Sequence, residues 1–386
     1  MMRAPTLAQG EWRMSYRADV KCRVLAWMIA AACSGSAIAG DGIARDVVVC
    51  RVGSGAATLT AAAASVWLEQ HASDGTLVQT IALPTGVSGS NRRLTLGGTK
   101  KGEGGLAVSS DGNYLTLAGY DAAPGTASVA ESDSPTVNRI VARVDAAGNV
   151  DTKTRLDGAF STSSVGGAVT VDGSAFWVSG GGTGGVGGVW YVPQGTTGGT
   201  QILADPNNVR TVNIASGQLF ATTSTAGTTS VFAIGTGLPT TASQSVFLLY
   251  GLPVLQPYGF AFFDRSQAID GLDTLYVADD RTIATGGGIQ KWTFDESVWH
   301  LATTFTDGLG VNGVRGLAAE AQGANIVLYA TTVETTGNRL VRVVDDGSVS
   351  PAATTIAMAA ANTVYRGVAL AWVAPVADVV FKDGFE

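Results

Sequence analysis

Three arginines occupy the same place in three similar phrases of the sequence. Arg210, Arg315 and Arg366 each stand directly before a short strand-like run, as in Arg315-Gly316-Leu317-Ala318, and Tyr258 stands at this place in a fourth phrase. A guanidinium group presents a planar fork of donors that matches the geometry of a carboxylate. If these side chains converge, the chemistry they favour is the binding of an anion such as a uronate or a sulfated sugar.

Acidic and aromatic residues recur near the same places. Glu103 precedes another of these phrases, and Tyr120-Asp121 and Asp279-Asp280 each follow the next strand-like run. We predict Glu103, Tyr120 and Asp121 as ligand-binding residues beside the arginines and Tyr258. Asp279 and Asp280 are candidates to ligate Ca²⁺, which needs six or more oxygen ligands, and no other cofactor is predicted. In an alternative interpretation the arginines pair with Asp121, Asp279 and Asp280 and hold the structure together.

Known catalytic motifs are absent from the sequence. It contains no Walker-type phosphate loop, no G-x-S-x-G, no H-E-x-x-H and no C-x-x-C. Gly182-Thr183-Gly184-Gly185-Val186-Gly187 matches G-x-G-x-x-G, but a strand-like run follows it where a dinucleotide site needs a helix. No catalytic residue is therefore assigned, and Tyr258 is the one candidate for proton transfer.

The elements that must position these residues are short strands in an internal repeat. Runs rich in Val, Leu, Ile, Thr and Phe alternate with Gly, Asp and Ser clusters, and Asp-Gly pairs mark tight hairpins. The sequence phrase in which these arginines stand recurs at intervals that are typical of the four-stranded blades of a β-propeller. Its six starts lie near residues 105, 167, 211, 259, 316 and 367.

The two ends of the repeat complement each other. The last start, Tyr365–Val373, has no strands after it, whereas Val47–Val52, Ser65–His71 and Thr76–Leu83 come before the first one. Together they make one blade, which closes the ring and removes an open sheet edge. We therefore predict an all-β fold with a single six-bladed β-propeller over residues 46–373, and five or seven blades are the alternatives.

Two phrases carry a family resemblance. Ser109-Ser110-Asp111-Gly112-Asn113-Tyr114-Leu115 resembles the turn and strand of YncE-like propellers, and Asp273-Thr274-Leu275-Tyr276-Val277-Ala278-Asp279 resembles a strand of NHL and SMP-30-type propellers. The resemblance covers the repeats and implies the propeller fold. It leaves the function open, because this superfamily holds both enzymes and inert scaffolds.

The N-terminus reads as an export signal. Basic residues precede the apolar run Val24–Ala32, and Ala37-Ile38-Ala39 fits the cleavage site of a signal peptide over residues 1–39, with Met14 as an alternative start. A second interpretation is a lipid anchor at Cys33. We expect a secreted, periplasmic or cell-surface protein with no transmembrane helix, and residues 374–386 form a predicted C-terminal tail.

These features favour an exported, non-catalytic module that binds an anionic saccharide or a protein partner. The net charge of −7 and the pI near 4.9 argue against a nucleic-acid partner. One alternative is a lyase or hydrolase of an acidic polysaccharide, in which Tyr258 transfers a proton while Arg315 and Arg366 neutralise the uronate. Another is an SMP-30-like metal-dependent lactonase. The sequence does not predict the oligomeric state.

The export signal has a direct test. When the full chain is expressed in a Gram-negative host, we expect N-terminal sequencing of the exported protein to begin at Gly40, because signal peptidase cuts after a small-x-small motif such as Ala37-Ile38-Ala39. A mature protein that begins with a lipid-modified Cys33 would contradict this and establish the anchor.

Overall fold

The structure is a computed structural model, and it describes residues 45–334 and 337–373. The predicted signal peptide, the candidate anchor at Cys33 and the predicted tail of residues 374–386 lie outside the described residues. The described part is almost entirely β-structure, and its helices are three short 3-10 turns, η2 (Val129–Glu131), η3 (Thr183–Gly185) and η4 (Ile283–Thr285). None of its helices has the length and apolar character needed to span a membrane.

Four sheets are separate antiparallel meanders of four strands each. The first contains β9 (Val165–Val169), β10 (Ala175–Gly180), β11 (Gly188–Pro193) and β12 (Thr200–Leu203). The second contains β13 (Thr211–Ala215), β14 (Gln218–Thr223), β15 (Ser230–Ile234) and β16 (Val246–Leu248). The third contains β17 (Pro257–Phe263), β18 (Thr274–Asp279), β19 (Gly288–Phe294) and β20 (Trp299–Phe305). The fourth contains β21 (Val314–Gln322), β22 (Asn325–Thr332), β23 (Arg339–Asp345) and β24 (Thr354–Met358).

The fifth sheet has nine strands, because a short strand joins two meanders. One meander contains β25 (Val364–Leu370), β1 (Val47–Val52), β2 (Ala63–His71) and β3 (Leu77–Ala82). The other contains β5 (Leu106–Val108), β6 (Tyr114–Tyr120), β7 (Arg139–Asp145) and β8 (Val150–Leu156). The link is β4 (Thr95–Gly97), which pairs with β2 and β6. Four sheets are therefore separate rather than the six expected, and β4 is an element that the sequence pattern did not predict.

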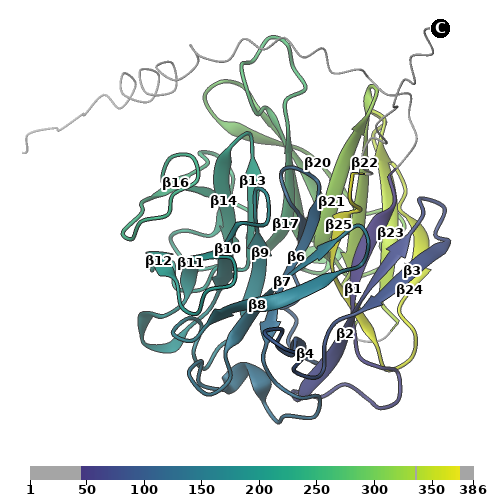
Figure 1. The fold of residues 1–386 in the computed structure, drawn as a ribbon. Helices are drawn as coiled ribbons and strands as arrows, with labels where there is room; N and C mark the ends of the chain where they lie inside the picture. The colour runs from purple at the N-terminus through teal and green to yellow at the C-terminus, as the bar shows by residue number, and fades with distance from the viewer. Residues whose placement is uncertain (1–44, 335–336, 374–386) are drawn as a thin grey trace, which may run out of the picture. The chain divides into compact units, whose positions relative to one another are not determined.

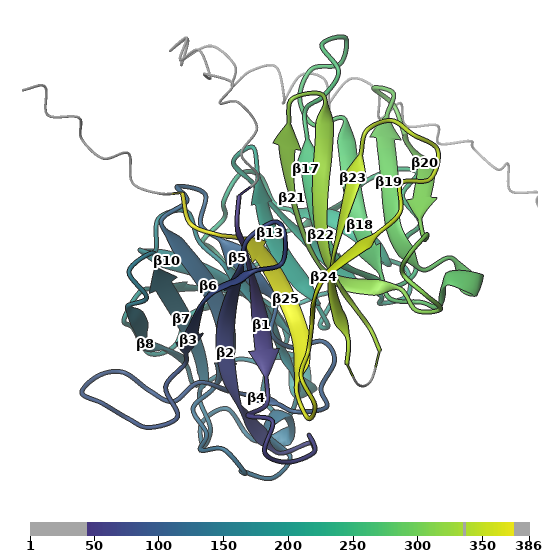
Figure 2. The ribbon, with the colours of Figure 1, turned by 90° about the vertical axis from the view of Figure 1, so that its right-hand side faces the viewer.

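The strands are arranged as a β-propeller. The innermost strands β25, β5, β9, β13, β17 and β21 contact one another in that order and close into a ring. Figure 1 shows β9, β13, β17, β21 and β25 in the middle of the view. Each begins within a few residues of a predicted start of the repeat phrase. The predicted closure of the chain ends is also confirmed, because β25 pairs antiparallel with β1, with Val48 opposite Ala369 (Figure 2).

Apolar side chains fill the spaces between the sheets. Along β1, Val48 and Cys50 pack with Leu68 and Leu117, whereas Val47 and Val49 pack in a second cluster on the other face. A strand that is buried on both faces explains the unbroken apolar run in this part of the sequence.

Glycines of the repeat phrase allow the innermost strands to approach closely. A Cβ atom at Gly367 would lie 2.4 Å from the carbonyl oxygen of Gly104, and one at Gly316 would lie 2.7 Å from that of Arg366. A Cβ at Gly166 would lie 2.3 Å from the carbonyl oxygen of Arg210. The repeat therefore needs glycine because the backbone of the next innermost strand occupies the space of a side chain.

Hydroxyl groups on the second strands join neighbouring sheets. Thr331 Oγ1 accepts a hydrogen bond from Gly316 N at 2.9 Å and donates to the carbonyl oxygen of Arg366 at 2.5 Å. Ser179 Oγ accepts from Gly167 N at 3.1 Å and donates to the carbonyl oxygen of Arg210 at 3.4 Å. Thr222 Oγ1 likewise donates to the carbonyl oxygen of Tyr258 at 3.2 Å. We call these three contacts the hydroxyl clasps.

The close approach of the innermost strands predicts that one added methyl group destabilises the fold. Gly367→Ala should destabilise the fold by about 1–3 kcal/mol, because the new Cβ overlaps backbone atoms that cannot rotate away. Gly86→Ala is the matched control, because nothing lies within 4 Å of its Cβ position, and its change should stay below about 1 kcal/mol. The free energy of unfolding in urea is the measurement. Equal midpoints for the two variants would show that the strands have room for a side chain.

Candidate functional site

The predicted rim residues meet in one cavity. Glu103, Arg210, Tyr258, Arg315 and Arg366 all line a cavity of about 360 Å³. The innermost strands also supply apolar and small side chains to its wall, namely Leu106, Val108, Val212, Phe260, Leu317 and Val368. The cavity thus joins a cluster of guanidinium groups to an apolar wall, which is a common composition for a ligand site.

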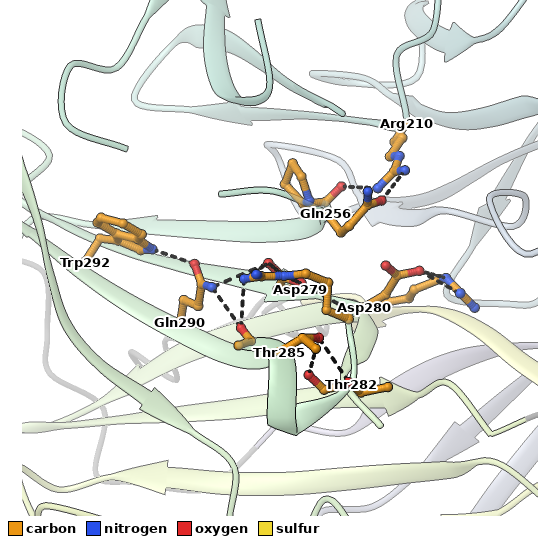
Figure 3. A network of polar contacts seen from close by, with 12 residues as sticks. Arg210, Gln256, Asp279, Asp280, Thr282, Thr285, Gln290 and Trp292 are labelled. Carbon is orange, nitrogen blue, oxygen red and sulfur yellow. Dashed lines mark hydrogen bonds and ion pairs between the residues drawn. The ribbon is translucent and has the colours of Figure 1, made fainter. Parts of the chain in front are cut away.

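The three arginines differ in their hydrogen-bond partners. Arg315 donates through Nε at 3.0 Å and Nη2 at 2.7 Å to Oδ2 of Asp280. Arg210 donates through Nη2 to the neutral amide oxygen of Gln256 at 2.6 Å (Figure 3). Arg366 donates through Nη2 to the carbonyl oxygen of Gly98 at 2.8 Å. The predicted pairing with Asp280 therefore holds for Arg315, whereas Arg210 and Arg366 form no ion pair with a carboxylate of the described chain.

Tyr258 lies among these guanidinium groups. The centre of its ring is 4.4 Å from Cζ of Arg210 and 5.2 Å from Cζ of Arg315. A cation near an aromatic face is attracted by the ring quadrupole. The ring therefore holds two cations near each other at the cavity, although their charges repel.

Arg366 is the most deeply buried of the three arginines. Its residue is 6% exposed, and its Nε atom is buried without a hydrogen-bond partner among the described residues. The pKa of Arg366 is lowered to about 10, mainly by burial; the charge of Glu103 raises it and the charge of Arg315 lowers it. Arg366 remains cationic at neutral pH and keeps donor capacity for a ligand.

Glu103 is a buried carboxyl group beside Arg366. It is 3% exposed, and its oxygens accept hydrogen bonds from the Tyr120 hydroxyl at 2.7 Å and from Gly97 N at 2.7 Å. Burial raises the pKa of Glu103 to about 6, although these hydrogen bonds and the charge of Arg366 act in the opposite direction. The carboxyl group therefore titrates near neutral pH, inside the cavity lining.

Two predicted ligand-binding residues do not line the cavity. Tyr120 is fully buried behind it, where its hydroxyl holds Glu103 and accepts from Val165 N at 3.2 Å. Asp121 forms an ion pair with Arg93 at 2.8 Å. The strand β6 ends at Tyr120, so Tyr120 supports the site from within, whereas Asp121 follows the strand and pairs elsewhere.

The candidate calcium ligands are both engaged by arginines. Asp279 pairs with Arg281 at 3.0 Å, and Asp280 pairs with Arg315 (Figure 3). In the part of the chain that the structure describes, no three His, Cys, Asp or Glu residues gather closely enough to hold a metal ion. The charge of each aspartate is thus balanced by a guanidinium group within the protein.

The cavity has two charged lining residues that the repeat pattern did not single out. Lys101 and Glu334 both line it, and Glu334 pairs with Arg339 at 2.8 Å. Lys101 lies two residues before Glu103 and could have been found by following the same rim segment. Glu334 follows β22, the second strand of its sheet, so the same position that pointed to Tyr120-Asp121 and Asp279-Asp280 could have found it.

The comparisons with known proteins leave the ligand open. No family model and no curated protein matches the chain. Among solved structures, it is similar to the hydrazine synthase of Kuenenia stuttgartiensis, with a TM-score of 0.34 and 12% identity over 72% of this chain and 75% of that one. A triple arginine-to-alanine mutant of AofleA from Arthrobotrys oligospora has a TM-score of 0.30 and 12% identity, over 78% and 70% of the two chains. Likeness at this level says nothing of the activity of this chain.

The support of Glu103 by Tyr120 predicts a pH-dependent loss of stability. Tyr120→Phe removes a hydroxyl that favours the ionised carboxylate, so it should raise the pKa of Glu103 further above 6. A carboxyl group whose pKa is raised by folding destabilises the fold as the pH rises through that pKa. We therefore expect a loss of about 1–3 kcal/mol at pH 7 and a smaller loss at pH 5, measured by urea unfolding.

Tyr329→Phe is the control for this prediction. The Tyr329 hydroxyl is also buried, and burial raises its pKa above the ordinary value, so its removal should change the free energy of unfolding equally at both pH values. Equal losses for Tyr120→Phe at the two pH values would show that its hydroxyl does not act on the charge of Glu103.

Proposed function

We propose that this protein is an exported β-propeller that binds a small organic anion, such as a uronate, in its central cavity. Export rests on the signal-peptide pattern of residues 1–39. The observation that carries the proposal is the state of Arg210 and Arg366, which line one cavity and form no ion pair with a carboxylate of the described residues. A buried guanidinium without a bound counter-charge is costly, and an anionic ligand would supply that charge.

The charge of the whole chain supports a specific site. The chain carries a net charge of −7, yet Lys101, Arg210, Arg315 and Arg366 outnumber Glu103 and Glu334 in the lining. A local cationic field in an acidic protein acts on a ligand that enters the cavity, whereas the surface as a whole repels large polyanions. This arrangement favours a short acidic saccharide over a long polymer.

We further propose that the propeller has six blades. The four separate sheets count as four blades, and the two meanders joined by β4 count as two more. The relation to YncE, NHL and SMP-30-type propellers is a proposal that rests on the two phrases quoted above.

A second candidate function is a lyase or hydrolase that acts on an acidic polysaccharide. It is favoured by Tyr258, whose hydroxyl makes no hydrogen bond within the described part of the chain while two guanidinium groups lie near its ring. The metal-dependent lactonase gains no such support, because Asp279 and Asp280 are both paired with arginines. The binding function remains the first choice because it requires only the donors that the cavity already presents.

A ligand panel tests the binding function. Glucuronate and galacturonate oligosaccharides should raise the stability of the mature protein, by about 2.7 kcal/mol at a hundred times the dissociation constant, and neutral sugars should not. Arg210→Ala and Arg315→Ala should each weaken binding roughly tenfold or more, because each removes a charge-assisted hydrogen bond. Thermal unfolding and calorimetry are the measurements.

Arg265→Ala is the matched control for these variants. Arg265 is exposed, donates to the carbonyl oxygens of Gly323 and Ala324, and does not line the cavity, so its loss should leave affinity unchanged. Stabilisation that survives Arg210→Ala and Arg315→Ala would place the ligand elsewhere. No stabilisation by any uronate would favour a protein partner, and conversion of the saccharide, lost in Tyr258→Phe, would establish the enzyme.

A further inference from the structure

Arg366 has N–H donors that make no hydrogen bond within the described part of the protein. A guanidinium group has five N–H donors, and only Nη2 of Arg366 has a hydrogen-bond partner in the described chain, Gly98. Its Nε is buried and unpartnered although the residue is only 6% exposed. Because Arg366 lines the cavity, a ligand carboxylate can reach the unused donors at the Nη end of the guanidinium group, whereas Nε is closed off.

Glu103 is the carboxylate that faces Arg366 in the absence of a ligand. The other groups that act on the charge of Arg366 are Arg315, Cys50 and Tyr258. No hydrogen bond joins Glu103 and Arg366, since the carboxyl oxygens accept from Tyr120 and Gly97. Arg366 and Glu103 therefore attract each other through charge, without a hydrogen bond, and a ligand carboxylate that accepts a hydrogen bond from Arg366 would be a stronger partner.

A second anion at Arg366 would come close to the carboxylate of Glu103. Like charges repel strongly where water is excluded, and one of two neighbouring carboxyl groups then stays protonated. Glu103 is nearly fully buried, so solvent cannot screen the repulsion. Neutralisation of Glu103 removes the repulsion without moving any backbone.

We propose that anion binding in this cavity is proton-linked: a ligand carboxylate binds Arg366 as Glu103 takes up one proton from solvent. This inference rests on the proposed anion-binding function and names its regulation. An exported protein of this kind would bind its ligand more tightly in an acidic medium and release it as the medium becomes alkaline.

The groups around Glu103 leave it as the titrating member of the site. Tyr120 and Arg139 face it from β6 and β7, and Arg366 faces it from β25. The pKa of Tyr120 lies well above its ordinary value, and that of Arg366 is about 10, so neither changes charge between pH 5 and pH 8. Burial raises the pKa of Cys50, which faces Arg366, to about 12.

One histidine lies near enough to need a control. His71 on β2 contacts Tyr365, with 6.4 Å between ring centres, and Tyr365 lines the cavity. Burial lowers the pKa of His71, but Glu69, whose Oε2 lies 3.7 Å from Nε2, and the carbonyl oxygen of Gly75, 3.1 Å from Nδ1, raise it above its ordinary value. The other histidine of the chain, His300, pairs with Asp295 on an exposed part of β20.

Calorimetry of the mature wild-type protein with galacturonate tests the proposal. Galacturonate stays ionised above about pH 5, as expected of a sugar carboxylate. Full linkage to Glu103 predicts binding roughly a hundredfold tighter at about pH 5 than at about pH 8. Titrations in two buffers of different ionisation enthalpy should report uptake of close to one proton at pH 7, a readout that needs no variant.

Two variants assign the proton. Glu103→Gln should bind galacturonate with an affinity independent of pH, and His71→Gln should keep the wild-type dependence. Binding of equal strength across the range, or no proton uptake, overturns the linkage but leaves the anion site intact. Transfer of the pH dependence to His71 also overturns it. Absence of binding at every pH overturns the proposed function and the linkage with it.

Discussion

The close approach of the innermost strands is the constraint on which this structure depends. Glycines of the repeat phrase bring innermost strands against the backbone of the next, as Gly367 lies against Gly104 and Gly316 against Arg366. The hydroxyl clasps then tie the sheets, since Thr331 hydrogen-bonds to its own innermost strand and to the next one. Buried hydroxyl groups with both roles satisfied stabilise one arrangement over its alternatives. Contacts between backbones and the hydroxyl clasps therefore hold the ring together, and the charged side chains at the cavity are not needed for this.

The same constraint places the charged residues. The carbonyl groups that the clasps hold belong to Arg210, Tyr258 and Arg366, and all three of these residues line the cavity. The sheet before Arg315 has Ala278 where the clasps have a hydroxyl, and here the guanidinium itself is held by Asp280. A clasp that fixes a backbone leaves the side chain of that residue free for a ligand. Arg315 already uses donors on Asp280, so fewer of its donors remain for a ligand.

The arginines fall into two groups according to the partners of their guanidinium groups. Arg93 with Asp121 and Arg281 with Asp279 are complete ion pairs away from the cavity lining. Arg210 and Arg366 instead rest on neutral oxygens, and the nearest opposite charge to Arg366 is a carboxyl group that burial has made easy to protonate. Perturbed titration in a cavity is a physical mark of functional sites, and here it falls on Glu103, which Tyr120 and Gly97 hold by hydrogen bonds.

The sequence by itself determined the strands, their repeat and the closure of the chain ends. These follow from local causes, such as period-two patterns and turn chemistry, and from the surplus of strands at Val47–Leu83 that matches the deficit after Val373. It also placed Arg210, Tyr258, Arg315 and Arg366 at equivalent positions and Glu103 next to such a position, so their meeting in one cavity was predictable from the repeat. Only the tertiary structure decided that β4 joins two meanders, that Tyr120 is buried, and which arginine has a carboxylate partner. Burial and distance between residues remote in the chain set these charges and pKa values, and no local pattern encodes them.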